Sequence, residues 1–245
     1  MGLLDIFKSK DERTERSREK NISRALNKYA QSPDRLRALE ILLQDGSEEA
    51  LFGMMRRFGF RYDKSIEDEF EKEWVCDGLV SKGAAALPAV RRYLKSADSV
   101  SWPLRVLDKI AASKEEELEV LQEVLARHEP GYERDPTKKI QVLTHLGHLD
   151  NAGISALVAP YLQDMDEGVR FTAAETLLKH RDQPASAAAL LTQFANDTEE
   201  SLRLRLRIAD GFIECKWPVG EFREAVEKKL PDAYKLDKAG LFQKK

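Results

Sequence analysis

A helical pattern that recurs every 31–37 residues is the feature that most constrains how this chain folds. In residues 166–178 an aspartate stands at the N-cap position and apolar side chains follow at helical spacing. A break at residues 181–184 separates this helix from a second apolar helix at 187–194, and Asn196-Asp197 starts the pattern again. Period-two strand patterns are missing, while Ala, Leu, Glu, Lys and Arg dominate. The sequence therefore predicts repeated helical hairpins.

A marker residue stands at a comparable place in the first helix of each copy. In chain order the markers are Arg37, Trp74, Arg105, Lys139, Arg170 and Arg203. The second helices agree, because two Tyr-Leu pairs at 93–94 and 161–162 lie 68 residues apart, which is two periods. We predict six hairpins, at about residues 33–59, 67–96, 102–128, 136–164, 167–195 and 199–230.

The element Asp-x-x-Val-Arg-x-x-Ala-Ala-x-x-Leu at 166–177 resembles the HEAT repeat, in particular the short HEAT-like class first noted in phycobilin lyases. The resemblance covers about residues 33–230 and is strongest at 135–195. It implies an all-α, right-handed α-solenoid with first helices on the convex face and second helices on the concave face. The physics agrees, because one hairpin is too small to bury its own apolar stripe and must stack on its neighbours.

The predicted organisation has three parts. Residues 1–32 form a charged segment and a capping helix at about 11–31, residues 33–230 form the solenoid, and residues 231–245 form a C-terminal tail that folds back over the last hairpin. We expect a capping helix at each end of the solenoid. In this repeat class the recurring basic residue usually joins an aspartate and the loop backbone. We therefore expect Arg105, Arg170 and Arg203 to connect successive hairpins rather than to bind a partner.

Charge and targeting signals narrow the function classes. The chain has 40 basic and 43 acidic residues, a net charge of −3, so a nucleic acid or an acidic membrane is not implied as a partner. Asp5 interrupts the apolar start, no secretory signal is recognisable, and no window is apolar enough to span a membrane. We expect a cytoplasmic protein.

Catalytic and metal-binding motifs are missing from the sequence. His145 and His148 could share a helix face and hold a metal, but no third ligand cluster lies near them in sequence, so a structural role is expected. Cys76 and Cys215 are expected to be small buried side chains. We predict that the protein is not an enzyme and needs no cofactor.

The remaining hypothesis is a scaffold or adaptor that binds another protein through its concave face or its inter-repeat loops. Two alternatives stay open: a DNA-binding enzyme of the HEAT-like alkylpurine glycosylase type, and a bilin lyase-like protein. A glycosylase should carry a continuous basic track and bind DNA in a salt-sensitive way. A lyase should have a ligand-sized inner cavity and take up a coloured bilin.

Two sets of residues are candidates for partner binding. The first is a basic strip on second helices, formed by Arg56, Arg57, Arg91, Arg92 and Lys95; the alternative is ordinary exposed arginines beside an acidic run. The second is an aromatic ridge on long inter-repeat loops, formed by Tyr62, Trp102 and Tyr132 with Arg61 and Arg134 beside them. The alternative is that these rings fold inward as local packing.

Overall fold

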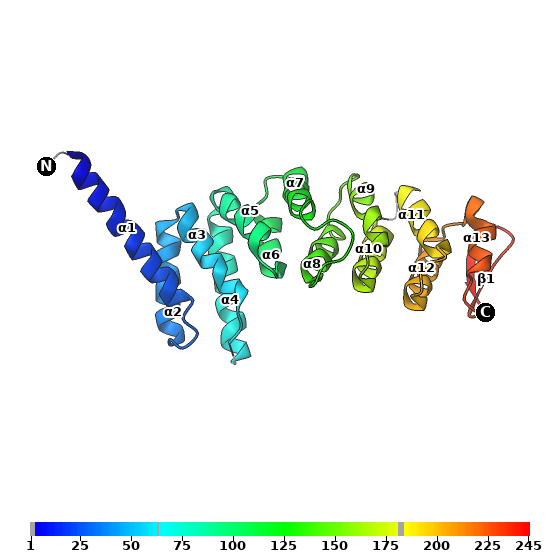
Figure 1. Ribbon diagram of the computed structural model, residues 1–245, viewed down its shortest axis with the longest axis horizontal. Coiled ribbons are helices and arrows are strands. Elements are labelled where there is room, and N and C mark those ends of the chain that lie inside the picture. Colours follow the sequence, from blue (N-terminus) through cyan, green and yellow to red (C-terminus); the bar gives the residue numbers. More distant parts are fainter. Residues whose placement is uncertain (1–2, 63, 181–183) are drawn as a thin grey trace. The chain divides into compact units, whose positions relative to one another are not determined.

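The computed structural model describes residues 3–62, 64–180 and 184–245, with only the backbone described for residues 3–10. The described chain packs as two compact units, residues 1–120 and residues 121–245. It is all-α apart from one short hairpin of two strands near the C-terminus (Figure 1). None of its described helices combines the length and the apolar character that crossing a membrane requires.

In the first unit the helices stack in chain order. They are α1 (Leu3–Ala25), α2 (Ser32–Asp45), α3 (Glu48–Met55), the 3-10 helix η1 (Arg56–Gly59), α4 (Ser65–Ser81), η2 (Gly83–Ala86), α5 (Leu87–Ser96) and α6 (Ser101–Ile110). The first helices α2, α4 and α6 pack on one another in one layer, and α3 packs on α5 in a second layer. Helix α1 covers α2 and α3 at the start of the stack (Figure 1).

Helix α7 (Lys114–Leu125) begins in the first unit and ends in the second. The second unit continues with α8 (Thr137–Leu146), α9 (Ile154–Val158), η3 (Ala159–Gln163), α10 (Glu167–Lys179), α11 (Pro184–Ala195), α12 (Leu202–Cys215), η4 (Gly220–Phe222) and α13 (Arg223–Lys228). Here α8, α10 and α12 form the layer of first helices, and α11 packs between η3 and α13 in the other layer. Each predicted hairpin range thus holds a first and a second helix.

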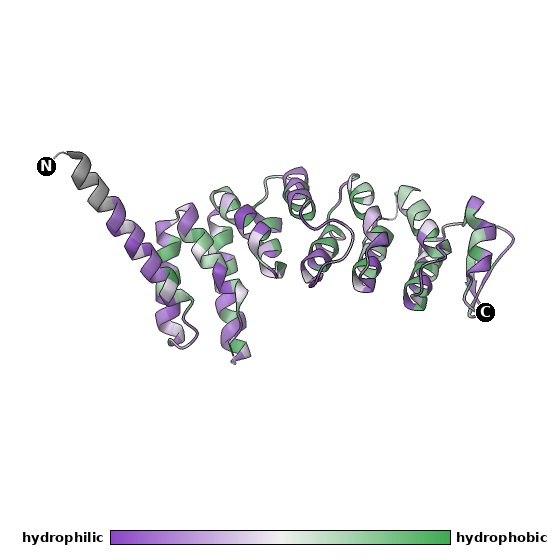
Figure 2. Ribbon diagram, viewed as in Figure 1, coloured by the Kyte–Doolittle hydropathy of each residue, from purple (hydrophilic) through white to green (hydrophobic). Residues whose placement is uncertain are grey.

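The cores of the two units lie between these layers. Most helices carry both a hydrophilic and a hydrophobic face (Figure 2), as the periodicity predicts. The buried side chains of the first helices include Leu39, Val75, Leu107, Val142 and Leu177. Two glycines allow the closest approaches between helices: a Cβ at Gly53 would overlap Ile22, and one at Gly211 would overlap Leu178. Handedness and the assignment of convex and concave faces remain predictions.

The C-terminal cap is a β-hairpin, so the prediction of a helix there was wrong. Strands β1 (Tyr234–Leu236) and β2 (Phe242–Lys244) pair in antiparallel register, and Gly240 supplies the left-handed turn at φ +82°. Phe242 packs against Phe194 and Phe212 at centroid distances of 5.4 and 5.8 Å. The alternation of apolar residues at 234, 236 and 242 fits a strand, but each strand is only three residues long.

The N-terminal helix is confirmed with different bounds, because it starts at residue 3 and ends at Ala25 rather than near residue 31. Beyond it, the side chain of Asn27 accepts a hydrogen bond from the Tyr29 backbone N–H at 3.0 Å, a local turn that competes with the helix. The chain then enters α2, which has a proline in its first turn.

Candidate functional site: inter-repeat loops and a buried charge cluster

Five charged side chains of the first unit form a buried cluster between α2, η1 and α4. They are Arg35, Arg57, Asp68, Glu71 and Lys72, each exposed by 4% or less. The Glu71 carboxylate accepts hydrogen bonds from Arg35 Nε at 3.0 Å and from Arg57 Nε at 2.9 Å. The Asp68 carboxylate accepts from Arg57 Nη2 at 2.8 Å and from Lys72 Nζ at 2.6 Å. Every charge in the cluster thus has an opposite partner.

The local sequence explains why the carboxylates meet. Asp68, Glu71 and Lys72 stand at i, i+3 and i+4 on α4, so they share one face of the helix. Burial alone would raise the pKa of Glu71, but hydrogen bonds from Arg35, Arg57 and a serine hydroxyl hold it below its usual value. The pKa of Asp68 is lowered in the same way against the effect of burial. Both carboxylates therefore stay charged inside the protein.

Tyr62 closes this cluster from the loop side. Its ring contacts the guanidinium groups of both Arg35 and Arg57, with centroid distances of 4.0 and 4.1 Å. Burial raises the pKa of Tyr62 to about 12, and the nearby Glu71 carboxylate acts in the same direction. Tyr62 therefore serves as local packing, which is the alternative to its place on an exposed ridge.

The other residues of the predicted ridge are divided between the units. In the first unit, Trp102 is half-buried and stacks on Phe58 at 5.8 Å, with the Arg105 guanidinium 4.3 Å from its ring. In the second unit, Tyr132 is 80% exposed and Arg134 is exposed as well. Of the three rings, only Tyr132 presents a large free surface.

The predicted basic strip is interrupted. Arg57 is fully buried, because the 3-10 turn η1 places successive side chains about 120° apart, so it points away from exposed Arg56 into the charge cluster. Arg92 pairs with Glu49 at 2.8 Å, and Arg91 lies 3.6 Å from Glu119. The carboxylates of Glu49 and Glu119 therefore interrupt the positive charge of the strip.

Two members of the strip nevertheless share a groove. Arg56 and Arg92 line it together with Glu15, Glu19 and the aromatic side chain of Phe52, so the groove is mixed in charge. Lys95, the last member, is half-buried on α5 and is absent from the groove lining. The strip as predicted, a continuous basic surface of five side chains, is therefore not formed.

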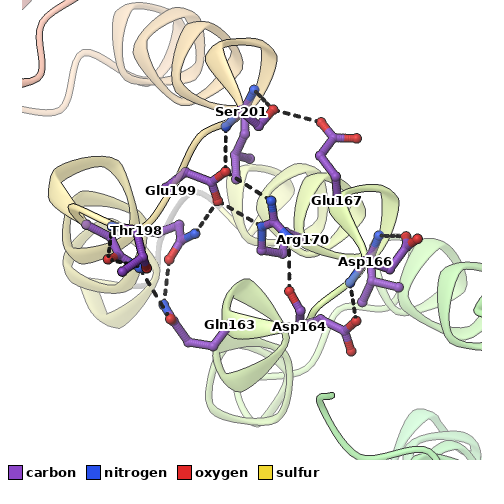
Figure 3. Close-up of polar contacts among 12 residues, drawn as sticks. Gln163, Asp164, Asp166, Glu167, Arg170, Thr198, Glu199 and Ser201 are labelled. Atoms are coloured by element: carbon purple, nitrogen blue, oxygen red, sulfur yellow. Dashed lines mark hydrogen bonds and ion pairs between the residues drawn. The ribbon is translucent and has the colours of Figure 1, made fainter. Parts of the chain in front are cut away.

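In the second unit, buried ion pairs connect one inter-repeat loop to the next (Figure 3). Arg170 on α10 donates from Nε and Nη2 to the Glu199 carboxylate at 2.8 and 3.0 Å. Its third nitrogen, Nη1, donates to the carbonyls of Asp164 and Met165 at 3.0 and 3.1 Å. Gln193 donates to the same Glu199 carboxylate at 2.6 Å. One arginine thus fixes the loop before its own helix and the loop before the next first helix.

Lys139 makes the same connection one repeat earlier. Its Nζ donates to the Asp164 carboxylate and to the Gly131 carbonyl, both at 2.9 Å. The Gly131 backbone N–H donates in turn to Asp164 at 3.1 Å. The structural role predicted for the recurring basic residue is confirmed for Arg170 and fits Lys139.

The other markers do not make this connection. Arg105 is half exposed, and Arg203 is 62% exposed and pairs with Glu167 at 3.0 Å, so neither binds the loops as predicted. In the first repeat the connecting residue is Arg35, two positions before Arg37. In the last repeat Arg205, two positions after Arg203, donates to the Phe194 carbonyl in the last turn of α11 and to the Asn196 carbonyl in the loop that follows.

Three large apolar side chains are exposed along the same loops. Tyr132, Met165 and Leu202 are exposed by 80%, 72% and 56%, and they precede or begin α8, α10 and α12. We call this set the loop edge. Sequence reasoning found Tyr132 and missed the other two; the available signal was an apolar residue within a few positions of the start of a first helix.

Metal ligands and reactive cysteines do not gather in the described residues. No cluster of three or more His, Cys, Asp or Glu suited to a metal ion occurs there. His145 is half-buried and His148 is exposed. Cys76 is buried, and burial raises the pKa of its thiol, whereas Cys215 is only half-buried and so departs from the prediction.

Comparison with known proteins gives a family for part of the chain. No curated protein and no solved structure shows significant similarity to it. A family model described as HEAT repeats matches residues 118–209. This range includes Lys139 and Arg170, the two markers that connect successive loops. The resemblance to HEAT repeats predicted from the sequence is therefore confirmed for residues 118–209.

Proposed function

We propose that the protein is a non-catalytic cytoplasmic scaffold that binds another protein through the loop edge of its second unit. HEAT repeats generally mediate protein interactions, which supports the class of function. The observation that carries the proposal is the loop edge itself, where Tyr132, Met165 and Leu202 expose large apolar surfaces on successive repeats. Large exposed apolar side chains mark an interaction site where they form one patch.

The loops that carry these residues are held in place before any partner arrives. Gly131 is bound through both its N–H and its carbonyl, and Met165 is bound through its carbonyl by Arg170. A surface that is already ordered loses less conformational entropy on binding, which favours affinity. Large apolar and aromatic side chains on such loops match the usual composition of binding hot spots.

The experiment compares variants in a pull-down from the native cell, read out by quantitative mass spectrometry. Tyr132→Ser with Met165→Ser should lose the partner that the unaltered protein captures, with a melting temperature changed by about 2 °C or less. The matched control is Ile66→Ser with Phe70→Ser, two exposed apolar side chains on α4 of the first unit. A partner retained by the loop-edge variant, or lost equally from the control, would contradict the proposal.

A nucleic-acid enzyme of the glycosylase type receives no support from the charge pattern. Glu49 and Glu119 stand against Arg92 and Arg91 in the strip that such an enzyme would need as a continuous basic track. Salt-sensitive binding of double-stranded DNA at physiological salt would favour that alternative, and uptake of a coloured bilin would favour the lyase alternative.

A further inference from the structure

A groove of about 800 Å³ opens at one end of the first unit, beside the buried charge cluster. It lies between the turn that joins α1 to α2, the start of α2, and the loop that leads from η1 to α4. The charged and aromatic side chains that line it are Lys28, Tyr29, Arg35, Arg61, Tyr62 and Lys64, with Glu67 at its edge.

The charges of the groove are strongly biased. Among the described residues, four cations line it, Lys28, Arg35, Arg61 and Lys64, against one carboxylate, that of Glu67, which pairs with Lys64 at 3.0 Å. Apart from Arg35, which belongs to both sets, the buried cluster has two cations and two carboxylates, so it does not offset this excess. The N-terminus of α2, which has no side-chain cap, adds the positive end of the helix dipole, opposed by one carboxylate in its first turn, that of Asp34. An anionic group entering the groove therefore meets a positive potential from several elements.

The positions of the lining groups are also fixed to different degrees. Arg35 is 4% exposed and held by Glu71 and the Ala30 carbonyl, so it forms a rigid wall. Arg61 and Lys28 are exposed and can adjust to a ligand. Tyr29 is 86% exposed, which leaves a large aromatic surface uncovered at the rim. Rigid and adjustable cations beside aromatic rings suit a ligand that is both acidic and aromatic.

We propose that this groove binds an acidic peptide segment of a partner protein, with an aromatic side chain of the segment packed against Tyr29. The groove belongs to the first unit and the loop edge to the second, so this proposal does not depend on the proposed function. Glutamate and aspartate side chains of the segment pair with Arg61 and Lys28 at the rim.

The charge of the whole unit favours a peptide over a nucleic acid. Residues 1–120 contain 22 basic and 23 acidic residues, a net charge of −1. Beyond Glu67, the exposed face of α4 carries Glu69 and Glu73, which would repel a phosphate backbone running past the groove. A short acidic segment needs only the local positive patch, whereas a nucleic acid needs an extended one.

Fluorescence anisotropy with the full chain tests the proposal. The probe is a fluorescein-labelled peptide of alternating glutamate and aspartate around one central tryptophan. We expect saturable binding that weakens about tenfold for Lys28→Glu with Arg61→Glu, two exposed side chains whose reversal leaves the fold intact. Tyr29→Ala should weaken this probe but not the same peptide with alanine in place of tryptophan.

The controls separate the groove from general electrostatics. Lys20→Glu with Lys109→Glu makes the same change in net charge on exposed sites outside the groove, and its affinity should stay within about twofold. A peptide with glutamine and asparagine in place of the acids should not bind. Three outcomes would overturn the proposal: no saturable binding to the unaltered protein, equal weakening by the control variant, or tighter binding of an oligothymidylate than of the acidic peptide. Because no loop-edge residue is changed, these outcomes leave the proposed function untouched.

Discussion

Replacement of Glu71 by glutamine tests whether the buried cluster stabilises the first unit. The carboxylate is fully buried and accepts hydrogen bonds from Arg35, Arg57 and Ser32. The substitution keeps the shape of the side chain but removes its charge. Arg57 keeps the Asp68 carboxylate, whereas Arg35 loses its carboxylate partner and keeps the Ala30 carbonyl and the ring of Tyr62.

The expected loss in the free energy of unfolding follows from the arginine charge that stays buried after the substitution. Removing one partner of a buried ion pair costs about 3–5 kcal/mol, because the remaining charge stays buried without compensation. The glutamine oxygen still accepts one hydrogen bond, so we expect the lower end, about 3 kcal/mol. The matched control is Glu73→Gln, two residues along the same helix, where a 63% exposed carboxylate lies 3.8 Å from Arg105. The Glu73→Gln substitution should lower the free energy of unfolding by about 1 kcal/mol or less.

Urea unfolding followed by circular dichroism measures both variants, with the free energy obtained by linear extrapolation and the slope checked against that of the unaltered protein. The pH dependence gives a second test. The folded-state pKa of Glu71 lies below its ordinary value of 4.5, so its contribution is complete above that value and is lost as the pH falls through the folded pKa. The difference between the unaltered protein and Glu71→Gln should therefore shrink in acid. A cost equal to that of Glu73→Gln, or a difference that grows in acid, would refute the reasoning.

Three further substitutions or reactions probe other parts of the fold. Arg170→Met should destabilise the second unit by about 3 kcal/mol in urea unfolding, because Glu199 is left buried without its cation; a cost under about 1 kcal/mol would contradict this. Gly211→Ala should cost about 1–3 kcal/mol of the same free energy, since its Cβ would overlap Leu178, and an unchanged midpoint would show that the helices can separate freely. The thiol of Cys76 should react slowly with Ellman's reagent in the native state because it is buried and its pKa is raised; two fast thiols would be inconsistent with its burial.

The helix pairs could be predicted because their signals are local. Asp166 illustrates this: its side chain accepts a hydrogen bond from the Val169 backbone N–H at 3.0 Å, the N-cap that the repeat pattern indicates. Periodic apolar residues then determine which face is buried. Both signals lie within one helix, so no knowledge of distant contacts is needed.

The errors over the arginines concern contacts between distant residues. Arg35 and Arg37 are both basic and both lie on α2, and the sequence within the helix does not say which one faces Glu71, a residue 36 positions beyond Arg35. The same holds for Arg57, whose burial depends on Asp68 and Glu71. A paired-arginine motif indicates positive charge, but the direction of each side chain depends on the 3-10 turn that carries it.

The buried pairs also explain how similar repeats keep one order in the stack. Leucine and alanine faces of successive hairpins are nearly interchangeable, so apolar packing alone distinguishes neighbours poorly. The pair formed by Arg170 and Glu199 is not interchangeable, because Glu199 is 1% exposed and would be left as an unpaired buried charge beside a hairpin that lacks the cation. The penalty of about 3–5 kcal/mol is a large share of the stability of a small unit. The same contacts immobilise the loops from which Met165 projects, so the residues that specify the neighbour also hold the proposed binding surface in place.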